Sequence, residues 1–350
     1  MKVEQIFWRD IEDLAGNWSG LGVDVKRPSA AKPPLRLLSG DNLRMQLVLG
    51  DQTLLWGTLS RCYYGVWLIR NTLLEQLPLT LVEAIDSPTV EQHAQLAPAL
   101  RLKAWSRFFI DQLRHQQPDF LYPGYWLVRG LWHQPLKLIQ RQWAQDQHWN
   151  FVGGQDALSH LPEWSIRGDN LLSNQEPGAP RWVALGEAGG AVVGLHAVDP
   201  FSGRLTGRLK WWRKKVREGS LPPILLWYVS GLNAYLILDG HYRLQAALDE
   251  QVAPQFLVLS SPKLSHYRRN EEEEQKVLNA LLRQSEKNNL DLSHVNQRLI
   301  YTFDDRPYHR VGSQAWAGIA SNEAWVDEVT RYLTAHGMTE QLPNIIERRE

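Results

Sequence analysis

One short segment constrains the fold of this 350-residue chain more than any other. Tyr235-Leu236-Ile237-Leu238 is a β-prone run, Asp239-Gly240 is a turn dipeptide, and residues 243–248 are strong helix formers. The segment therefore predicts a strand, a tight turn and a helix in direct succession. A helix N-terminus offers backbone N–H groups and a positive dipole end, and glycine lets the backbone approach a ligand closely. Since Arg243 can bind phosphate oxygens with its planar fork, the segment indicates a phosphate site.

The flanking residues predict the rest of a small α/β unit. Residues 196–200 are typical of a short strand, and residues 206–218 of a helix that Gly219 and two prolines end. Residues 224–228 and 255–259 are apolar runs that predict two further strands. The turn thus lies inside a unit of alternating strands and helices.

This order of elements, with the Gly240-x-x-Arg243 spacing, resembles the core of the ParB/sulfiredoxin-like superfamily over about residues 193–262. Members share a strand ending in Asp-Pro, a helix ended by glycine before a proline, and a hairpin leading to a Gly-x-x-Arg helix. The resemblance implies a nucleoside triphosphate with Mg²⁺ at the turn, or a nuclease-like active site there. Gly240, Tyr242 and Arg243 would bind the nucleotide, Asp239 and His241 would be catalytic, and Asp239 would also bind the metal. Sulfiredoxins have their catalytic cysteine where His241 stands, so reductase chemistry is excluded.

Three residues of the turn have structural as well as chemical explanations. Asp239 is a candidate general base or metal-binding carboxylate, but an aspartate here also caps a turn or a helix. His241 is a candidate acid, base or phosphate donor because histidine ordinarily titrates near neutral pH, yet a histidine at a helix start is often structural. Tyr242 stands where relatives commonly have histidine or arginine, so its phenol would have to replace that donor.

The helix predicted before the turn is the most basic stretch of the chain. Its cations alternate with Trp211-Trp212 and are candidate contacts to DNA, since lysine and arginine neutralise backbone phosphates. A solvated helix face with one buried Trp side is the alternative. The cations are Arg204, Arg208, Lys210, Arg213, Lys214, Lys215 and Arg217.

The remaining chain predicts an α+β protein of three parts. Residues 1–150 combine hairpin patterns over 35–80 with an amphipathic helix over 96–115, and we expect them to form a separate N-terminal β-rich and helical domain. A second helical pattern covers residues 136–146.

Turn residues crowd positions 153–180, where we expect the domain boundary. The ParB/sulfiredoxin-like core would then occupy 180–262, beginning with a glycine-rich hairpin formed by residues 181–185 and 191–195. Residues 263–350 are expected to be a mostly helical C-terminal extension that packs on the core, with one helix over 271–284.

Composition limits the partners and the compartment. Acidic and basic residues balance at 38 each, so binding to DNA would need a local patch. A single cysteine, Cys62, excludes an intramolecular disulfide framework. Because no apolar run is long enough to cross a bilayer, we expect a cytoplasmic protein without membrane contact. The 16 tryptophans are explained better by buried cores than by base-stacking platforms.

Two functions agree with these features. The first is a nucleotide-binding ParB-like protein that catalyses phosphoryl transfer or phosphodiester cleavage at the turn with a divalent metal. The second is a non-catalytic binding or regulatory protein that keeps the fold and engages a protein or DNA partner. The fold alone does not choose between them, because function depends on the site.

Overall fold

Short strands and a few longer helices alternate along the chain, so the expected α+β class is confirmed. The structure is a computed structural model that describes residues 5–26, 32–60, 64–73, 80–135, 143–151, 164–171, 178–185, 190–195, 203–266, 275–276, 278–279, 283, 309–313 and 315–347. The chain divides into two units, one of Met1–Pro262 with Ser313–Glu350 and one of Lys263–Gly312.

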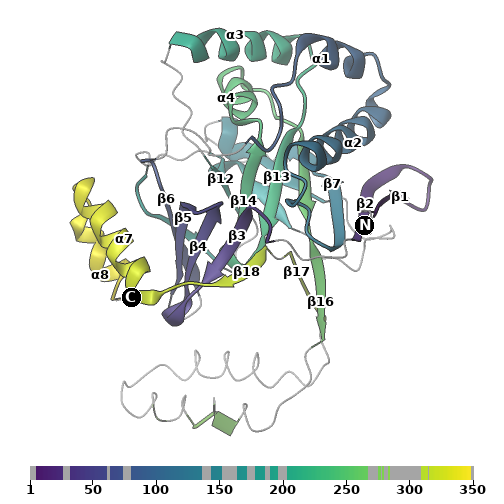
Figure 1. The fold of residues 1–350 in the computed structure, drawn as a ribbon. Helices are drawn as coiled ribbons and strands as arrows, with labels where there is room; N and C mark the ends of the chain where they lie inside the picture. The colour runs from purple at the N-terminus through teal and green to yellow at the C-terminus, as the bar shows by residue number, and fades with distance from the viewer. Residues whose placement is uncertain are drawn as a thin grey trace. The chain divides into compact units, whose positions relative to one another are not determined.

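A seven-stranded mixed sheet contains the predicted strand before the turn (Figure 1). Its strands follow the order β1 (Gln5–Glu12), β2 (Trp18–Lys26), β7 (Gly124–Gly130), β15 (Phe256–Ser260), β13 (Ile224–Val229), β14 (Ala234–Asp239) and β12 (Ala191–Gly194). β13 pairs parallel with β15 and antiparallel with β14, and β14 pairs parallel with β12. The three strands predicted over 224–228, 235–238 and 255–259 are thereby confirmed. The strand expected over 196–200 lies outside the described residues.

The N-terminal region does not form a sheet of its own apart from the predicted core. β7 pairs antiparallel with β15, with Leu127 opposite Ser260, and β2 continues the sheet beyond β7. The expected division between 1–150 and 180–262 therefore runs through one sheet. The physical reason is that β15, whose residues are all buried, would otherwise leave an open sheet edge, which β7 covers with backbone hydrogen bonds.

A second sheet of six strands contains the hairpins predicted within 35–80. Its order is β11 (Arg181–Ala184), β6 (Gly65–Arg70), β5 (Gln52–Leu59), β4 (Arg44–Leu49), β3 (Leu35–Ser39) and β18 (Trp316–Ile319), with the short η1 (Asp41–Leu43) between β3 and β4. β3 to β6 form an antiparallel meander, which confirms those hairpins as far as Arg70.

The hairpin expected between residues 181–185 and 191–195 is wrong. Both segments are strands, but β11 pairs with β6 of the six-stranded sheet, and β12 pairs with β14 of the seven-stranded sheet. The Arg181 guanidinium connects the two strands by donating to the carbonyl of Val192 at 3.1 Å. β11 and β12 each pair with a longer apolar strand, β6 and β14 respectively. They therefore belong to different sheets and do not pair with each other, although they are close in sequence.

Three helices pack on one face of the seven-stranded sheet: α1 (Ser87–Ala94), α2 (Pro98–Gln116) and α3 (Gly203–Arg217); α4 (His241–Asp249) follows β14 and contributes residues to the clusters on both faces. The helices expected over 96–115 and 206–218 are confirmed as α2 and α3. Residues of β13 alternate between the faces, so Leu225 and Trp227 lie in the main core with these helices and with the six-stranded sheet.

The opposite face of the seven-stranded sheet packs on a small three-stranded sheet. Its strands are β10 (Ser165–Arg167), β9 (Gln147–Asn150) and β8 (Trp132–Pro135), with η2 (Trp143–Asp146) and η3 (Gly168–Asn170) beside them. Trp149 of β9 is fully buried against Phe256, and its indole N–H donates to the carbonyl of Pro254 at 3.0 Å. The helix expected over 136–146 lies mostly outside the described residues, and η2 is its only described part.

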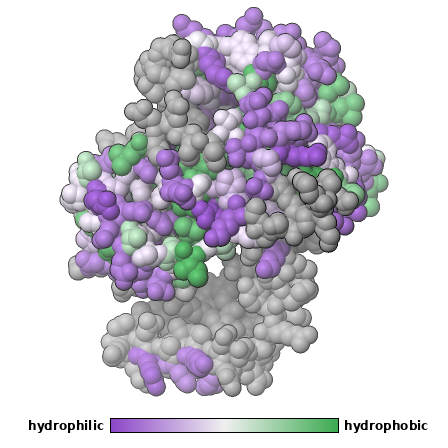
Figure 2. All heavy atoms as spheres, viewed as in Figure 1, coloured by the Kyte–Doolittle hydropathy of each residue, from purple (hydrophilic) through white to green (hydrophobic). Residues whose placement is uncertain are grey.

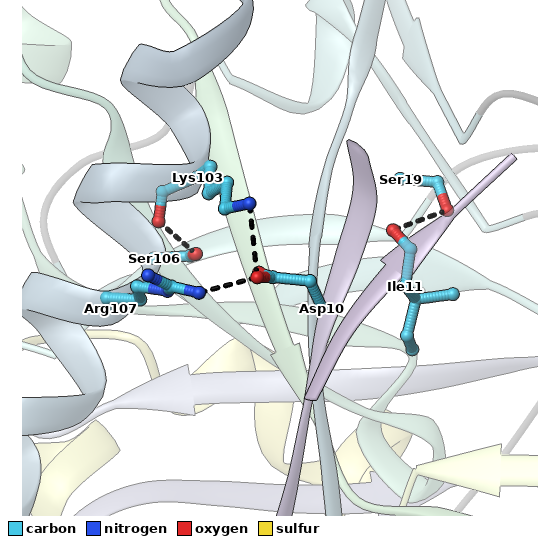
Figure 3. A network of polar contacts seen from close by, with 6 residues as sticks. All are labelled: Asp10, Ile11, Ser19, Lys103, Ser106 and Arg107. Atoms are coloured by element: carbon cyan, nitrogen blue, oxygen red, sulfur yellow. Dashed lines mark hydrogen bonds and ion pairs between the residues drawn. The ribbon is translucent and has the colours of Figure 1, made fainter. Parts of the chain in front are cut away.

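A charged contact fixes the edge strand β1 against α2 (Figure 3). The carboxylate of Asp10 accepts from Nζ of Lys103 at 3.1 Å and from Nη2 of Arg107 at 2.5 Å. Between these two residues, the hydroxyl of Ser106 donates to the carbonyl of Lys103 at 2.8 Å. Two basic residues of the amphipathic helix thus stabilise a sheet edge.

The C-terminal residues 313–347 complete the six-stranded sheet and do not extend the predicted core. β18 pairs parallel with β3, and α7 (Asn322–Ala335) packs across β4 to β6 (Figure 1), followed by η5 (Thr339–Gln341) and α8 (Leu342–Ile345). Trp325 is fully buried and donates to the carbonyl of Met45 at 2.9 Å, while Glu328 accepts from Gln46 and Trp56, both at 2.8 Å. The expectation of a helical extension on the core is wrong here, because this face of the six-stranded sheet carries apolar residues that pack with α7 and α8.

Serine hydrogen bonds fix the two points where the second unit leaves and rejoins the first. Ser313 is fully buried; its hydroxyl accepts from the backbone N–H of Ser261 at 3.0 Å, and its own N–H donates to the hydroxyl of Ser230 in η4 (Ser230–Leu232) at 2.8 Å. β16 (Pro262–His266) and β17 (His309–Ser313) form a two-stranded sheet at the base of the second unit. In the helix expected over 271–284, residues 275–276, 278–279 and 283 are helical, and the others lie outside the described residues.

The described surface is mostly polar on the face drawn in Figure 2, where apolar atoms form small separate groups. Within the described part of the chain, no helix combines the length and the apolar character needed to span a membrane.

Trp325→Ala should lower the free energy of unfolding by about 3–5 kcal/mol, because it removes a fully buried indole and its hydrogen bond. Urea unfolding followed by tryptophan fluorescence measures the change. The control is Thr334→Ala at an exposed position of the same helix, which should stay within about 0.5 kcal/mol of the wild type. A loss below about 1 kcal/mol for Trp325→Ala would show that α7 is not part of the cooperative unit.

Candidate phosphate site at the turn between β14 and α4

Gly240 links the end of β14 to the start of α4, as the sequence predicts. Its backbone is left-handed, with φ 110° and ψ 19°, a conformation that glycine adopts at little cost. A Cβ atom at this position would lie 2.9 Å from Nη2 and 3.2 Å from Nε of Arg243. The turn therefore requires glycine for its backbone conformation and also for the close approach of the guanidinium.

Arg243 points into the protein and is only 1% exposed. Its Nη2 donates to Oδ2 of Asp239 at 2.7 Å and to the carbonyl of Pro223 at 3.1 Å. Its guanidinium also lies 5.4 Å from the ring centre of Trp212 in α3 and 5.9 Å from that of Phe109 in α2. The Nε atom of Arg243 is buried and has no hydrogen-bond partner among the described residues. A buried cation with one unused donor thus lies beside the helix N-terminus.

Asp239 lies closer to solvent than its partner. Its side chain is 21% exposed, compared with 1% for that of Arg243. The ion pair connects residues i and i+4 across the turn, so it joins the last strand residue to the first turn of α4. The sequence prediction brought these two residues together correctly, but it did not predict that they would bind each other.

His241 faces β12. It is 6% exposed, and its Nε2 accepts the backbone N–H of Leu195 at 3.1 Å. This contact assigns the neutral tautomer with its proton on Nδ1, and it occupies the lone pair that a general base would use. Tyr242 is half-buried and packs against the main core. Of the five predicted residues, the structure therefore gathers Asp239, Gly240 and Arg243, while His241 and Tyr242 contact other parts of the fold.

Glu250 holds α3 against the end of α4. Its Oε1 accepts from Nε of Arg213 at 2.5 Å and from Nη1 of Arg217 at 2.7 Å. The hydrogen bond from Arg213 and then that from Arg217 lower the pKa of the Glu250 carboxyl. Trp212 also belongs to α3, so the contacts of Glu250 with α3 also keep the Trp212 ring beside Arg243.

Ion pairs engage much of the basic stretch that was predicted to contact DNA. Arg213 and Arg217 bind Glu250, and Lys214 and Lys215 bind Glu218 at 3.6 and 2.9 Å. The guanidinium of Arg208 lies 5.9 Å from the Trp212 ring, and Lys210 is exposed. The side chain of Arg204 lies outside the described residues. Two glutamates thus offset part of the positive charge of α3.

The residues that position Arg243 were missed by sequence reasoning. Pro223, Trp212 and Phe109 come from three separate segments, and Leu195 from a fourth. Trp212 gave the one usable signal, because it lies on the apolar side of the basic helix and had to pack on something. The carbonyl of Pro223 and the N–H of Leu195 are backbone groups, which leave no mark in the side-chain pattern.

The metal predicted at Asp239 would need further ligands besides this carboxylate. Among the described residues, no group of three or more His, Cys, Asp or Glu side chains could hold an ion. Mg²⁺ commonly uses one or two carboxylates and takes its other ligands from phosphate and water. Asp239 can supply such a carboxylate if a phosphate supplies the rest.

Comparison with known proteins gives no relative: no protein-family model, curated protein or solved structure matches the chain. The functional conclusion therefore depends on the geometry and chemistry of the turn.

Gly240→Ala should destabilise the protein by roughly 1–3 kcal/mol from backbone strain alone, and the contact with the guanidinium adds to this cost. The matched control is Gly207→Ala, an exposed position in α3 where a Cβ meets no atom within 4 Å. That substitution should stabilise the protein by about 0.5–1 kcal/mol, because alanine loses less backbone entropy in a helix. Chemical denaturation of both variants checks the opposite signs, and equal effects would contradict them.

Glu250→Gln should lower the melting temperature at pH 7, and the difference should vanish in acid. The folded-state pKa of Glu250 lies below its ordinary value of 4.5, so the charged carboxylate stabilises the fold above that value. This stability is lost as the pH falls through the folded-state pKa. Melting curves between pH 7 and strongly acidic pH measure it, with Glu340→Gln at an exposed position as the control. A difference that does not depend on pH would contradict the charge effect.

Proposed function

We propose that the chain is a nucleotide-binding protein with a ParB/sulfiredoxin-like core, in which the turn between β14 and α4 holds the phosphates. The observation that supports this most is the buried guanidinium of Arg243, whose Nε–H has no partner among the described residues. A buried donor without a partner costs about 1–3 kcal/mol, which a bound oxyanion would recover. The order α3, β13, β14, α4, β15 supports the ParB-like core proposed for about residues 193–262.

The surroundings of Arg243 suit a phosphate. α4 begins directly after Gly240, so its first N–H groups and the positive end of its dipole lie at the turn. Gly240 has no side chain, so the guanidinium of Arg243 lies directly against the backbone of the turn. We propose a nucleoside triphosphate as the ligand, with Asp239 as the protein ligand of its Mg²⁺. When bound, that ion would offset phosphate charge near the carboxylate.

The contacts at the turn favour binding over phosphoryl transfer or phosphodiester cleavage. His241 uses its Nε2 lone pair on the backbone of Leu195, so it acts as a positioning residue between β12 and α4. The carboxylate of Asp239 is bound by Nη2 of Arg243 at 2.7 Å. Neither residue is oriented as a general base toward a shared reacting atom.

The second function, a non-catalytic regulatory protein with a degenerate turn, is favoured by one specific observation. Asp239 already neutralises Arg243, so the turn can be complete without any ligand. In that case Lys210, Lys214 and Arg217, which are exposed on α3, would be the candidate contacts to DNA or to an acidic protein. The two functions differ in whether a nucleotide stabilises the fold.

A nucleoside triphosphate with Mg²⁺ should raise the melting temperature by roughly 5 °C at about 100 times its dissociation constant, because it binds only the folded state. Differential scanning fluorimetry with ATP, GTP, CTP and UTP, each with and without Mg²⁺, measures the shift. Arg243→Lys, which loses the planar fork, should abolish it, whereas Arg331→Lys at an exposed position of α7 should keep it.

If no nucleotide raises the melting temperature of the wild-type protein, the nucleotide-binding proposal is contradicted and the regulatory function is favoured. Because a buried Arg243→Lys change can itself destabilise the fold, isothermal titration of the wild-type protein with the best nucleotide gives a test that needs no variant.

A further inference from the structure

The guanidinium of Arg243 has one edge that is only half used. Nε and Nη2 form this edge; the Cβ position at Gly240 lies 2.9 Å from Nη2 and 3.2 Å from both Nε and Cζ, so the guanidinium packs directly against the turn. Nη2 donates to Asp239 and to Pro223, but Nε donates to none of the described residues. Carboxylates and phosphates bind such an edge best with two parallel hydrogen bonds. Asp239 therefore makes only one of the two hydrogen bonds that an oxyanion could make to this edge.

Asp239 is also more exposed to solvent than Arg243. The exposed fraction falls from 21% at the side chain of Asp239 to 1% at that of Arg243. On the inner side, the rings of Trp212 and Phe109 lie 5.4 and 5.9 Å from the guanidinium. An oxyanion that approaches from solvent thus meets the carboxylate first, and like charges repel.

We propose that Asp239 is a built-in competitor of the ligand: its carboxylate occupies the edge of Arg243 that a phosphate takes when it binds. This inference rests on the proposed phosphate site at the same turn. The 2.7 Å distance between Oδ2 and Nη2 is typical of a charge-assisted hydrogen bond, so a phosphate must replace a strong contact. Affinity for a bare phosphate is therefore low, and it rises when the carboxylate is neutralised or drawn away.

The substitution Asp239→Asn isolates this effect. The amide keeps the size of the side chain and an oxygen that can accept from Nη2, but it loses the charge that competes with phosphate. A purely structural ion pair predicts no gain in phosphate affinity, and an Asp239 that acts only as a metal ligand predicts no change without metal. Competition alone predicts that removing the charge of Asp239 strengthens the binding of phosphate.

The experiment is isothermal titration with inorganic phosphate, in EDTA so that no divalent ion takes part. Asp239→Asn should bind phosphate about tenfold more tightly than the wild type or better. The matched control is Asp249→Asn, which removes one negative charge from the exposed end of the same helix and should leave the affinity within about twofold. Circular dichroism and melting curves check that each variant is folded.

Equal or weaker phosphate binding by Asp239→Asn overturns the inference. If Asp239→Asn does not fold, Asp239→Ser is titrated in the same way, since serine is also polar and uncharged. A wild type that binds nucleotide with Mg²⁺, together with no gain in the variant, contradicts the competition and leaves the nucleotide function standing. A gain in the variant, together with no nucleotide binding by the wild type, supports the competition and contradicts the nucleotide function.

Discussion

The buried pair of Arg243 and Asp239 is the contact on which the centre of the fold depends. A guanidinium at 1% exposure is stable only when its charge is balanced, and removing one partner of such a pair costs about 3–5 kcal/mol. Asp239 supplies the charge at the end of β14, the carbonyl of Pro223 supplies a second acceptor before β13, and two aromatic rings from α2 and α3 complete the enclosure. Four segments are thus organised around one side chain.

The local structure of the turn could be predicted, but the direction of its charged side chains could not. The β-prone residues before Asp239, the flexibility of Gly240 and the helix formers after it are properties of neighbours in sequence, and they gave β14 and α4 correctly. Whether Arg243 points outward to solvent or into the protein depends on Phe109 and Trp212, which lie far away in the chain. An isolated Gly-x-x-Arg pattern is therefore compatible with an arginine that binds a phosphate and also with a buried arginine that forms an ion pair within the fold.

The division of the chain was harder to predict for a similar reason. Turn residues over 153–180 predicted a domain boundary, yet hydrogen bonds between β7 and β15 join the segments on either side of it. The strand pattern of β7 shows that it belongs to a sheet, but it does not say which strand it pairs with. The same holds for β11 and β12, which are neighbours in sequence and members of different sheets. Sheet partners are set by long-range packing, which a single sequence does not record.

The serine contacts at Ser261 and Ser313 have a consequence for how the chain can vary. They fix the start and the end of the segment 263–312 at neighbouring points of the first unit, so β18 and α7 reach their places whatever that segment contains. The entropy of closing a loop between two fixed points grows only with the logarithm of its length. A longer, shorter or wholly different segment between Pro262 and Ser313 therefore changes the folding free energy of the sheets very little. A change in the length of this segment therefore acts on the two sheets only through the small entropy of loop closure.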